Sequence, residues 1–154
     1  MPSILGAYTA VHVTISLFAI LIGVPAILQM LRGELKSSAI FGFFLLTALT
    51  SLTGFGFPAS SITPAHVFGV LTLALLATAY FSKSRATTKR VWRRVYLMSA
   101  IASQYLNTFV LVVQAFLKIG ILHALAPTQS EPPFLVAQVL VLALFSLPVG
   151  VPSP

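Results

Sequence analysis

Long apolar runs, separated by short polar segments, dominate the pattern of this chain. Runs of about 20 apolar residues are long enough to cross a bilayer as α-helices. The pattern predicts an all-α fold, a polytopic transmembrane helical bundle forming one domain over residues 1–154. Four spans are expected at about 5–30, 38–57, 64–81 and 93–123. A shorter run at about 134–150 predicts a fifth, which either crosses fully or lies at the edge of the bundle.

Polar residues interrupt the longest run at helical spacing. Gln104, Asn107, Gln114 and Lys118 are separated by three, seven and four residues, so they share one stripe of a helix. Polar groups at membrane depth are costly unless they find partners. We therefore expect the stripe to face protein, water or a ligand. For Gln104 and Asn107 the alternative to a ligand site is a pair of interhelical hydrogen bonds, each worth about 1 kcal/mol or less.

The composition limits which kinds of functional site the chain can form. The chain is 58% hydrophobic and 7% charged, whereas a soluble domain carries roughly 25% charged residues. It contains no cysteine and no aspartate, and its only acidic residues, Glu34 and Glu131, fall in predicted loops. Thiolate sites are therefore excluded. Di-iron carboxylate sites and intramembrane metalloproteolysis are strongly disfavoured, because no acidic residue lies in a predicted span. Ion-coupled transport is disfavoured because it usually needs a carboxylate at depth.

Basic residues are concentrated in one connection. The net charge is +7, and six of the nine Lys and Arg residues lie between Lys83 and Arg94. This pattern predicts a cytoplasmic loop that contacts anionic lipid headgroups, and it does not indicate nucleic-acid binding. Counting spans outward from this loop places the N-terminus outside. His12, His66 and His123 then all fall on the outer side or in the outer half.

The histidines raise two kinds of cofactor site. His12 and His66 could hold one haem b between helices. A metal site that adds His123 is a weaker alternative, because no spacing motif supports it. His66 could instead join Gln114 and Lys118 to hold a quinone carbonyl or a lipid headgroup, since such pockets are mostly apolar with a few convergent polar groups.

Prolines predict where helices begin and end. Thr63 before Pro64 indicates an N-cap with proline at the first helical position, and Pro25 indicates a kink near the end of the first span. Three further prolines predict a non-helical segment before the last span. They are Pro127, Pro132 and Pro133.

One stretch resembles a family of small, uncharacterised bacterial multi-pass inner-membrane proteins. The resemblance is strongest over Tyr105-Leu-Asn-Thr-Phe-Val-Leu-Val-Val-Gln-Ala-Phe-Leu-Lys118 and the following Ala124-Leu-Ala-Pro-Thr-Gln-Ser-Glu-Pro-Pro-Phe134. A Thr-Gly-Phe-x-Phe-Pro stretch ending at Pro58 and a histidine near His12 are also similar. The resemblance implies a multi-pass protein of the cell inner membrane, and it carries no activity.

These observations favour a non-enzymatic inner-membrane protein. It would act as an accessory subunit of a larger membrane complex, or would bind an apolar cofactor, lipid or quinone in the outer half of the bundle. The expected partner is another membrane protein or a second copy of the same chain. The alternative is a small redox protein with one haem b between His12 and His66. The candidate cofactor-binding residues are His12, His66, Gln104, Asn107, Gln114 and Lys118.

Overall fold

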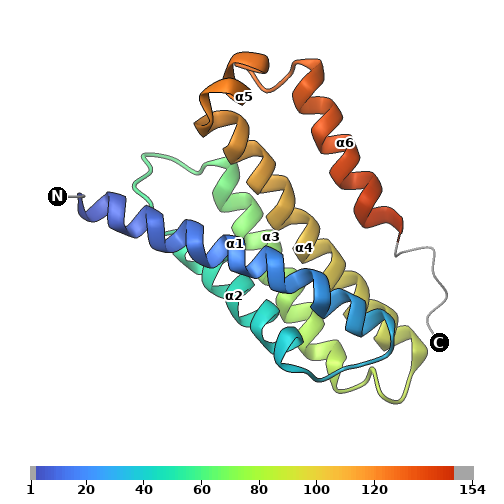
Figure 1. Ribbon diagram of the computed structural model, residues 1–154. Coiled ribbons are helices and arrows are strands. Elements are labelled where there is room, and N and C mark those ends of the chain that lie inside the picture. The colour runs from blue at the N-terminus through green and yellow to red at the C-terminus, as the bar shows by residue number, and fades with distance from the viewer. Residues whose placement is uncertain (1–2, 148–154) are drawn as a thin grey trace.

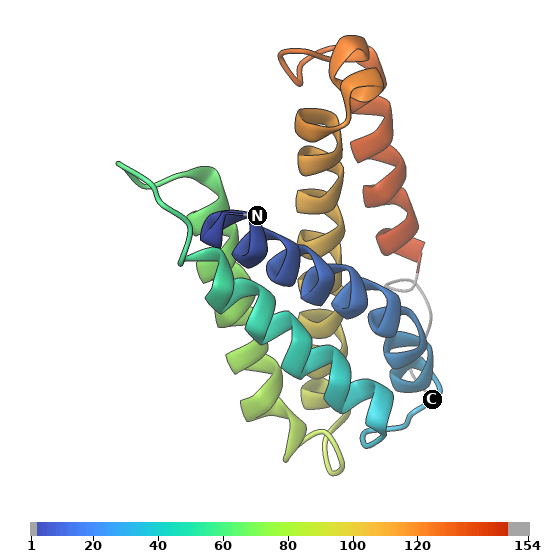
Figure 2. The ribbon, with the colours of Figure 1, turned by 60° about the vertical axis from the view of Figure 1, so that its left-hand side comes forward.

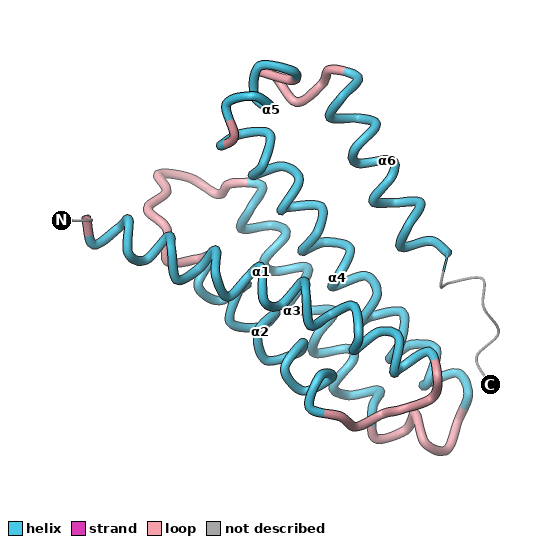
Figure 3. Tube along the Cα trace, in the orientation of Figure 1, coloured by secondary structure: helices cyan, strands magenta, loops and turns pink. Residues whose placement is uncertain are grey.

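The computed structural model describes residues 3–147 and is all-helical over that range (Figure 1). Six helices follow one another within residues 3–147. They are α1 (Ile4–Leu31), α2 (Ser38–Gly54), α3 (Pro64–Lys83), α4 (Arg90–Lys118), α5 (Gly120–Leu125) and α6 (Pro132–Ser146). Figure 3 shows that only short connections separate them.

Local sequence explains most of the helix boundaries. Ser3 and Ser37 cap α1 and α2, each accepting a hydrogen bond from a backbone N–H of the first turn, as serine commonly does at this position. The cap predicted at Thr63, with Pro64 at the first helical position, is confirmed. The run expected as one helix over 93–123 is divided at Ile119, whose backbone is extended. Gly120 follows directly, and glycine is unfavourable in the interior of a helix.

Helices α1 to α4 form two antiparallel pairs, α6 is an additional helix, and the short α5 lies between α4 and α6 along the chain. α1 packs along α2 and α3 packs along α4, with α2 and α3 joining the two pairs. α6 lies beside α4 in both views (Figures 1 and 2). Figure 2 shows α1 and α2 running obliquely to α4, so α1 meets α4 along only part of its length.

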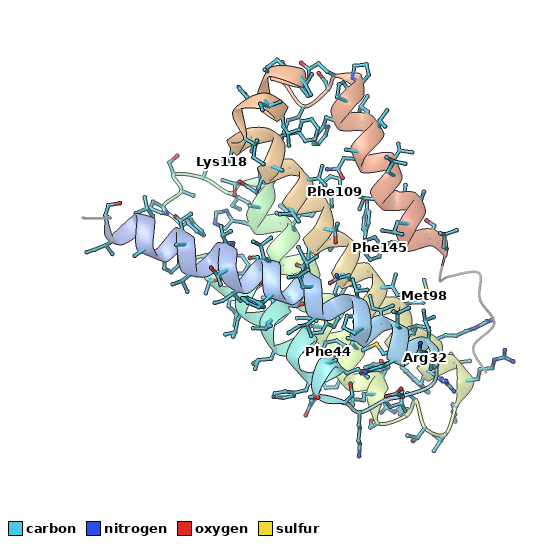
Figure 4. All side chains as sticks on the ribbon, in the orientation of Figure 1. Arg32, Phe44, Met98, Phe109, Lys118 and Phe145 are labelled. Atoms are coloured by element: carbon cyan, nitrogen blue, oxygen red, sulfur yellow. The ribbon has the colours of Figure 1, made fainter. Side chains whose placement is uncertain are left out.

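The main core lies near the end of the bundle that carries the basic connection, here called the basic end. Its buried residues come from the last turns of α1, the first half of α2, the end of α3 and the first half of α4. They include Ala26, Met30, Phe43, Tyr96 and Ala100. The opposite end carries His12, His66 and His123 and is here called the histidine end. Arg32 and Lys118 mark the two ends in Figure 4.

A second, smaller core holds the corner between α4 and α6. Phe116, Ala126 and Phe134 are buried together there, and the two phenylalanine rings meet edge to face with centroids 5.4 Å apart. Gln129 adopts a left-handed backbone with φ of 59°, and its side-chain Nε2 donates to Val113 O at 2.9 Å. The proline-containing segment is therefore a fixed corner between helices.

Within the part of the chain that the structure describes, three helices are long and apolar enough to cross a membrane, namely α1, α3 and α4. This supports a membrane protein built from a helical bundle. α2 and α6 are apolar but shorter, with 17 and 15 residues. Part of the expected fifth span, residues 148–150, lies outside the described residues. The four-span count, the crossing of α6 and the outside N-terminus remain predictions.

Candidate functional site

Gln104 is the most buried member of the predicted polar stripe. Its side chain is 1% exposed, and its Nε2 donates to Ile20 O of α1 at 2.7 Å. Within residues 3–147, its Oε1 has no hydrogen-bond partner. The amide lies against Gly23, where a Cβ would overlap it. Gln104 thus joins α4 to α1 at a position where glycine allows close approach.

Asn107, half-buried, bridges α4 to α2. Its Nδ2 donates to Thr47 Oγ1 at 3.2 Å, and Thr47 is fully buried. Gln138 on α6 makes a comparable contact with α4, where its Nε2 donates to Phe109 O at 3.3 Å. These amides hold helices together, which is the packing role that the sequence left open for Gln104 and Asn107.

Gln114 and Lys118, the remaining members of the stripe, are both exposed. Lys118 lies at the histidine end of α4 (Figure 4). His66 lines an apolar cleft between the α2–α3 connection and α3, and neither Gln114 nor Lys118 is among the residues around it. The structure therefore does not bring the expected group of His66, Gln114 and Lys118 into one pocket. The stripe changes from buried to exposed along α4 because α1 diverges from that helix (Figure 2).

His12 forms a contact between α1 and the end of α2. Its Nδ1 lies 2.8 Å from Thr53 Oγ1. The Thr53 hydroxyl has a carbonyl acceptor, Leu49 O, at 2.7 Å, so its single proton serves that bond and His12 Nδ1 donates to Thr53 Oγ1. In its neutral form His12 therefore presents a lone pair at Nε2. Tyr8 donates to Thr53 O at 2.5 Å and strengthens the same contact.

His66 has the opposite arrangement of its ring nitrogens. Its Nδ1 accepts a hydrogen bond from Thr63 N at 3.1 Å, so the neutral ring carries its proton on Nε2. The ring also stacks on Phe55, with centroids 5.8 Å apart and planes 16° apart. This side chain therefore offers an N–H donor, in contrast to the lone pair of His12.

An open cleft of about 720 Å³ lies beside His66, between the α2–α3 connection and α3. Phe55 and Phe57 form its aromatic wall, and Ile62, Val67 and Val70 contribute aliphatic surface. We call these residues with His66 the histidine cleft. His12 lies behind Phe57, with its ring edge-on to that phenylalanine at 5.0 Å. The lining is mostly apolar, and its polar side-chain groups are the N–H of His66 and the hydroxyls of Ser60 and Ser61. This combination suits a flat ligand with a carbonyl.

The two histidines do not fit a shared haem equally well. A haem iron takes a lone pair from an imidazole nitrogen, while the other ring nitrogen commonly donates a hydrogen bond. His12 meets both conditions. His66 would have to give up its bond from Thr63 N to present a lone pair at Nε2. Across residues 3–147 no three His, Asp, Glu or Cys residues cluster as a metal site, and His123 lies exposed on α5.

Sequence reasoning missed the aromatic wall. The apolar pattern predicts a span that extends to residue 57, but α2 ends at Gly54 and leaves Phe55 and Phe57 in the connection. The signal was the short Phe-Gly-Phe-Pro run, because proline and two nearby glycines disfavour helix. Comparison of the chain with protein-family models, with curated proteins and with solved structures found no match. The resemblance of segment 105–134 to a bacterial family stays an expectation.

Proposed function

We propose that this protein is a non-enzymatic membrane protein that binds a lipid-soluble carbonyl compound of the quinone class in the histidine cleft. The observation that carries the proposal is the pairing of the Phe55 and Phe57 wall with the Nε2–H of His66. A quinone ring can stack on aromatic side chains and accept one hydrogen bond at a carbonyl. We further propose that the chain resides in a bacterial inner membrane with its N-terminus outside.

A second candidate role is that of an accessory subunit. The exposed amide of Gln114 and the exposed Lys118 support it, because polar groups at membrane depth are costly when no protein covers them. A partner helix packed on this part of α4 would supply hydrogen-bond acceptors. The two roles are compatible, since the histidine cleft and these α4 residues are separate surfaces.

A bulky side chain placed in the histidine cleft tests the proposed quinone binding. Val70 lines the cleft and Val136 lies on α6 outside it, and both are 57% exposed. We expect purified full-length protein to bind decylubiquinone in detergent. Val70→Trp should weaken binding by about tenfold or more, the equivalent of about 1.4 kcal/mol, while Val136→Trp should leave it unchanged. Equal binding by the Val70→Trp variant and the wild-type protein would contradict the proposal.

Absorbance of the same sample tests the haem alternative. A quinone binder gives no band above 350 nm attributable to haem, whereas bound haem b gives a Soret band. We expect no such band in protein purified from native membranes. A stoichiometric Soret band that disappears in both the His12→Ala and the His66→Ala variants would favour the haem hypothesis over the quinone hypothesis.

A further inference from the structure

The basic end carries a second cleft, about 540 Å³ in volume, between the α1–α2 turn and the end of α3. Its lining combines cationic and apolar side chains from the two segments. We call it the basic cleft and define it by Leu35, Lys36, Tyr80, Phe81, Lys83 and Arg85. It lies at the opposite end of α3 from the histidine cleft, so an inference about it does not depend on the proposed quinone site.

Three cations converge on the basic cleft from different parts of the chain. Lys36 comes from the α1–α2 turn, and Lys83 and Arg85 come from the end of α3 and the connection after it. The Arg85 guanidinium lies over the Trp92 ring, 5.1 Å from its centroid, which limits the orientations available to that side chain. Arg85 is exposed, so its guanidinium is accessible to an anionic ligand.

Little negative charge is available within the chain to neutralise these cations. The whole sequence contains two acidic residues. Glu131 lies at the histidine end, where its carboxylate accepts hydrogen bonds from Thr128 and Ser130. Glu34 is exposed in the α1–α2 turn. The basic cleft thus keeps an excess of positive charge that an anionic ligand would satisfy.

The apolar wall of the cleft is exposed and aromatic. Tyr80 is 76% exposed and Phe81 is 66% exposed, both in the last turns of α3. Aromatic side chains next to cations are typical of the level where lipid headgroups meet acyl chains. A free phosphate or a soluble anion would use the cations and leave this wall uncovered, whereas a lipid would cover both.

We propose that the basic cleft binds one molecule of an anionic phospholipid. Its phosphate lies among Lys36, Lys83 and Arg85, and its acyl chains run along Leu35, Tyr80 and Phe81. The sequence predicts that the segment from Lys83 to Arg94 contacts anionic lipid headgroups. The cleft instead singles out two residues of that segment and adds Lys36 from another loop.

Two charge-matched triple variants test this site. The cleft variant carries Lys36→Gln, Lys83→Gln and Arg85→Gln. The control variant carries Arg32→Gln, Lys89→Gln and Arg94→Gln, which removes the same charge from exposed positions outside the cleft. Native mass spectrometry of full-length protein, titrated with phosphatidylglycerol or phosphatidylcholine, gives the stoichiometry and the affinity of each.

We expect wild-type protein to bind one phosphatidylglycerol in preference to phosphatidylcholine. The cleft variant should lose affinity on the order of 100-fold, because each cation near a headgroup contributes a several-fold factor, and the control variant should retain it. Glycerol 3-phosphate alone should not compete. Equal losses in both triple variants, equal binding of the two lipids, or full competition by glycerol 3-phosphate would each overturn the site. The single variant Lys36→Gln gives the same test with minimal disturbance of the fold.

Discussion

The two halves of the bundle are built differently. At the basic end, small residues and serines let four helices meet closely, and Phe43, Tyr96 and Ala100 are almost completely buried. At the histidine end, the same helices diverge, and their contacts consist of individual hydrogen bonds and ring pairs such as Tyr8 with Thr53 and Phe57. The difference shows that the main core and the histidine cleft lie at opposite ends of the bundle.

Replacing one phenylalanine in each half should give the largest contrast. Phe43 is fully buried in the main core, whereas Phe57 is half-buried beside the histidine cleft. Phe43→Ala should lower the free energy of unfolding by about 3 kcal/mol or more, because it leaves a cavity in packed surroundings. Phe57→Ala should cost clearly less. Unfolding in mixed detergent micelles measures both, and similar losses would remove the distinction between the halves.

Close helix approach can be tested at Gly23. Gly23→Ala should destabilise the protein by about 1–2 kcal/mol, since the new methyl group overlaps the buried Gln104 amide and the overpacking outweighs the better helix propensity of alanine. Gly120→Ala is the matched control, because no atom lies within 4 Å of a Cβ there. Thermal unfolding compares the two variants. Adding Gln104→Ala to Gly23→Ala should restore much of the loss, and a purely additive double variant would contradict the contact.

The smallest expected effect is a pH dependence of the corner between α4 and α6. Partial desolvation would raise the pKa of Glu131, but hydrogen bonds from Thr128 and Ser130 together hold it below its usual value of 4.5. Because the pKa in the folded protein is depressed, this carboxylate stabilises the corner above pH 4.5, and the contribution is lost as the pH falls through the lower folded value.

Hydrogen exchange measures this effect. The amides of Thr128 and Ser130 donate to the carboxylate, so their protection should fall on acidification below pH 4.5, and Glu131→Gln should weaken it at neutral pH. Protection that is independent of both changes would show that the corner is held only by its buried rings and by the bond from Gln129 to Val113.

Much of the fold could be predicted from the chain, because apolar runs, caps and prolines act locally. The N-cap at Thr63, the position of Pro64 at the start of α3 and the all-helical fold of residues 3–147 are confirmed. The sequence could not predict which residues of the polar stripe are buried. Gln104 and Gln114 share one helix face, but α1 covers only Gln104. The angle between α1 and α4 decides that difference, and it arises from packing between distant segments.

Similarly, the sequence identifies the two histidines as candidates, but it does not predict which ring nitrogen carries the proton in each. His12 differs from His66 because Thr53 serves one as an acceptor and the backbone of Thr63 serves the other as a donor. These partners are 41 residues and three residues away. Only the short-range one, the cap at Thr63, was visible as a pattern.

The unequal helix lengths described above have a consequence for the membrane itself. At 1.5 Å per residue, the 28 residues of α1 span about 42 Å and the 20 residues of α3 about 30 Å, close to the hydrocarbon thickness of a bilayer. A bilayer accommodates a long apolar helix by tilting it, so α1 and α3 would cross at different angles to the membrane normal. The oblique course of α1 relative to α4 agrees with such a tilt (Figure 2). A thinner bilayer would then favour a larger tilt of α1.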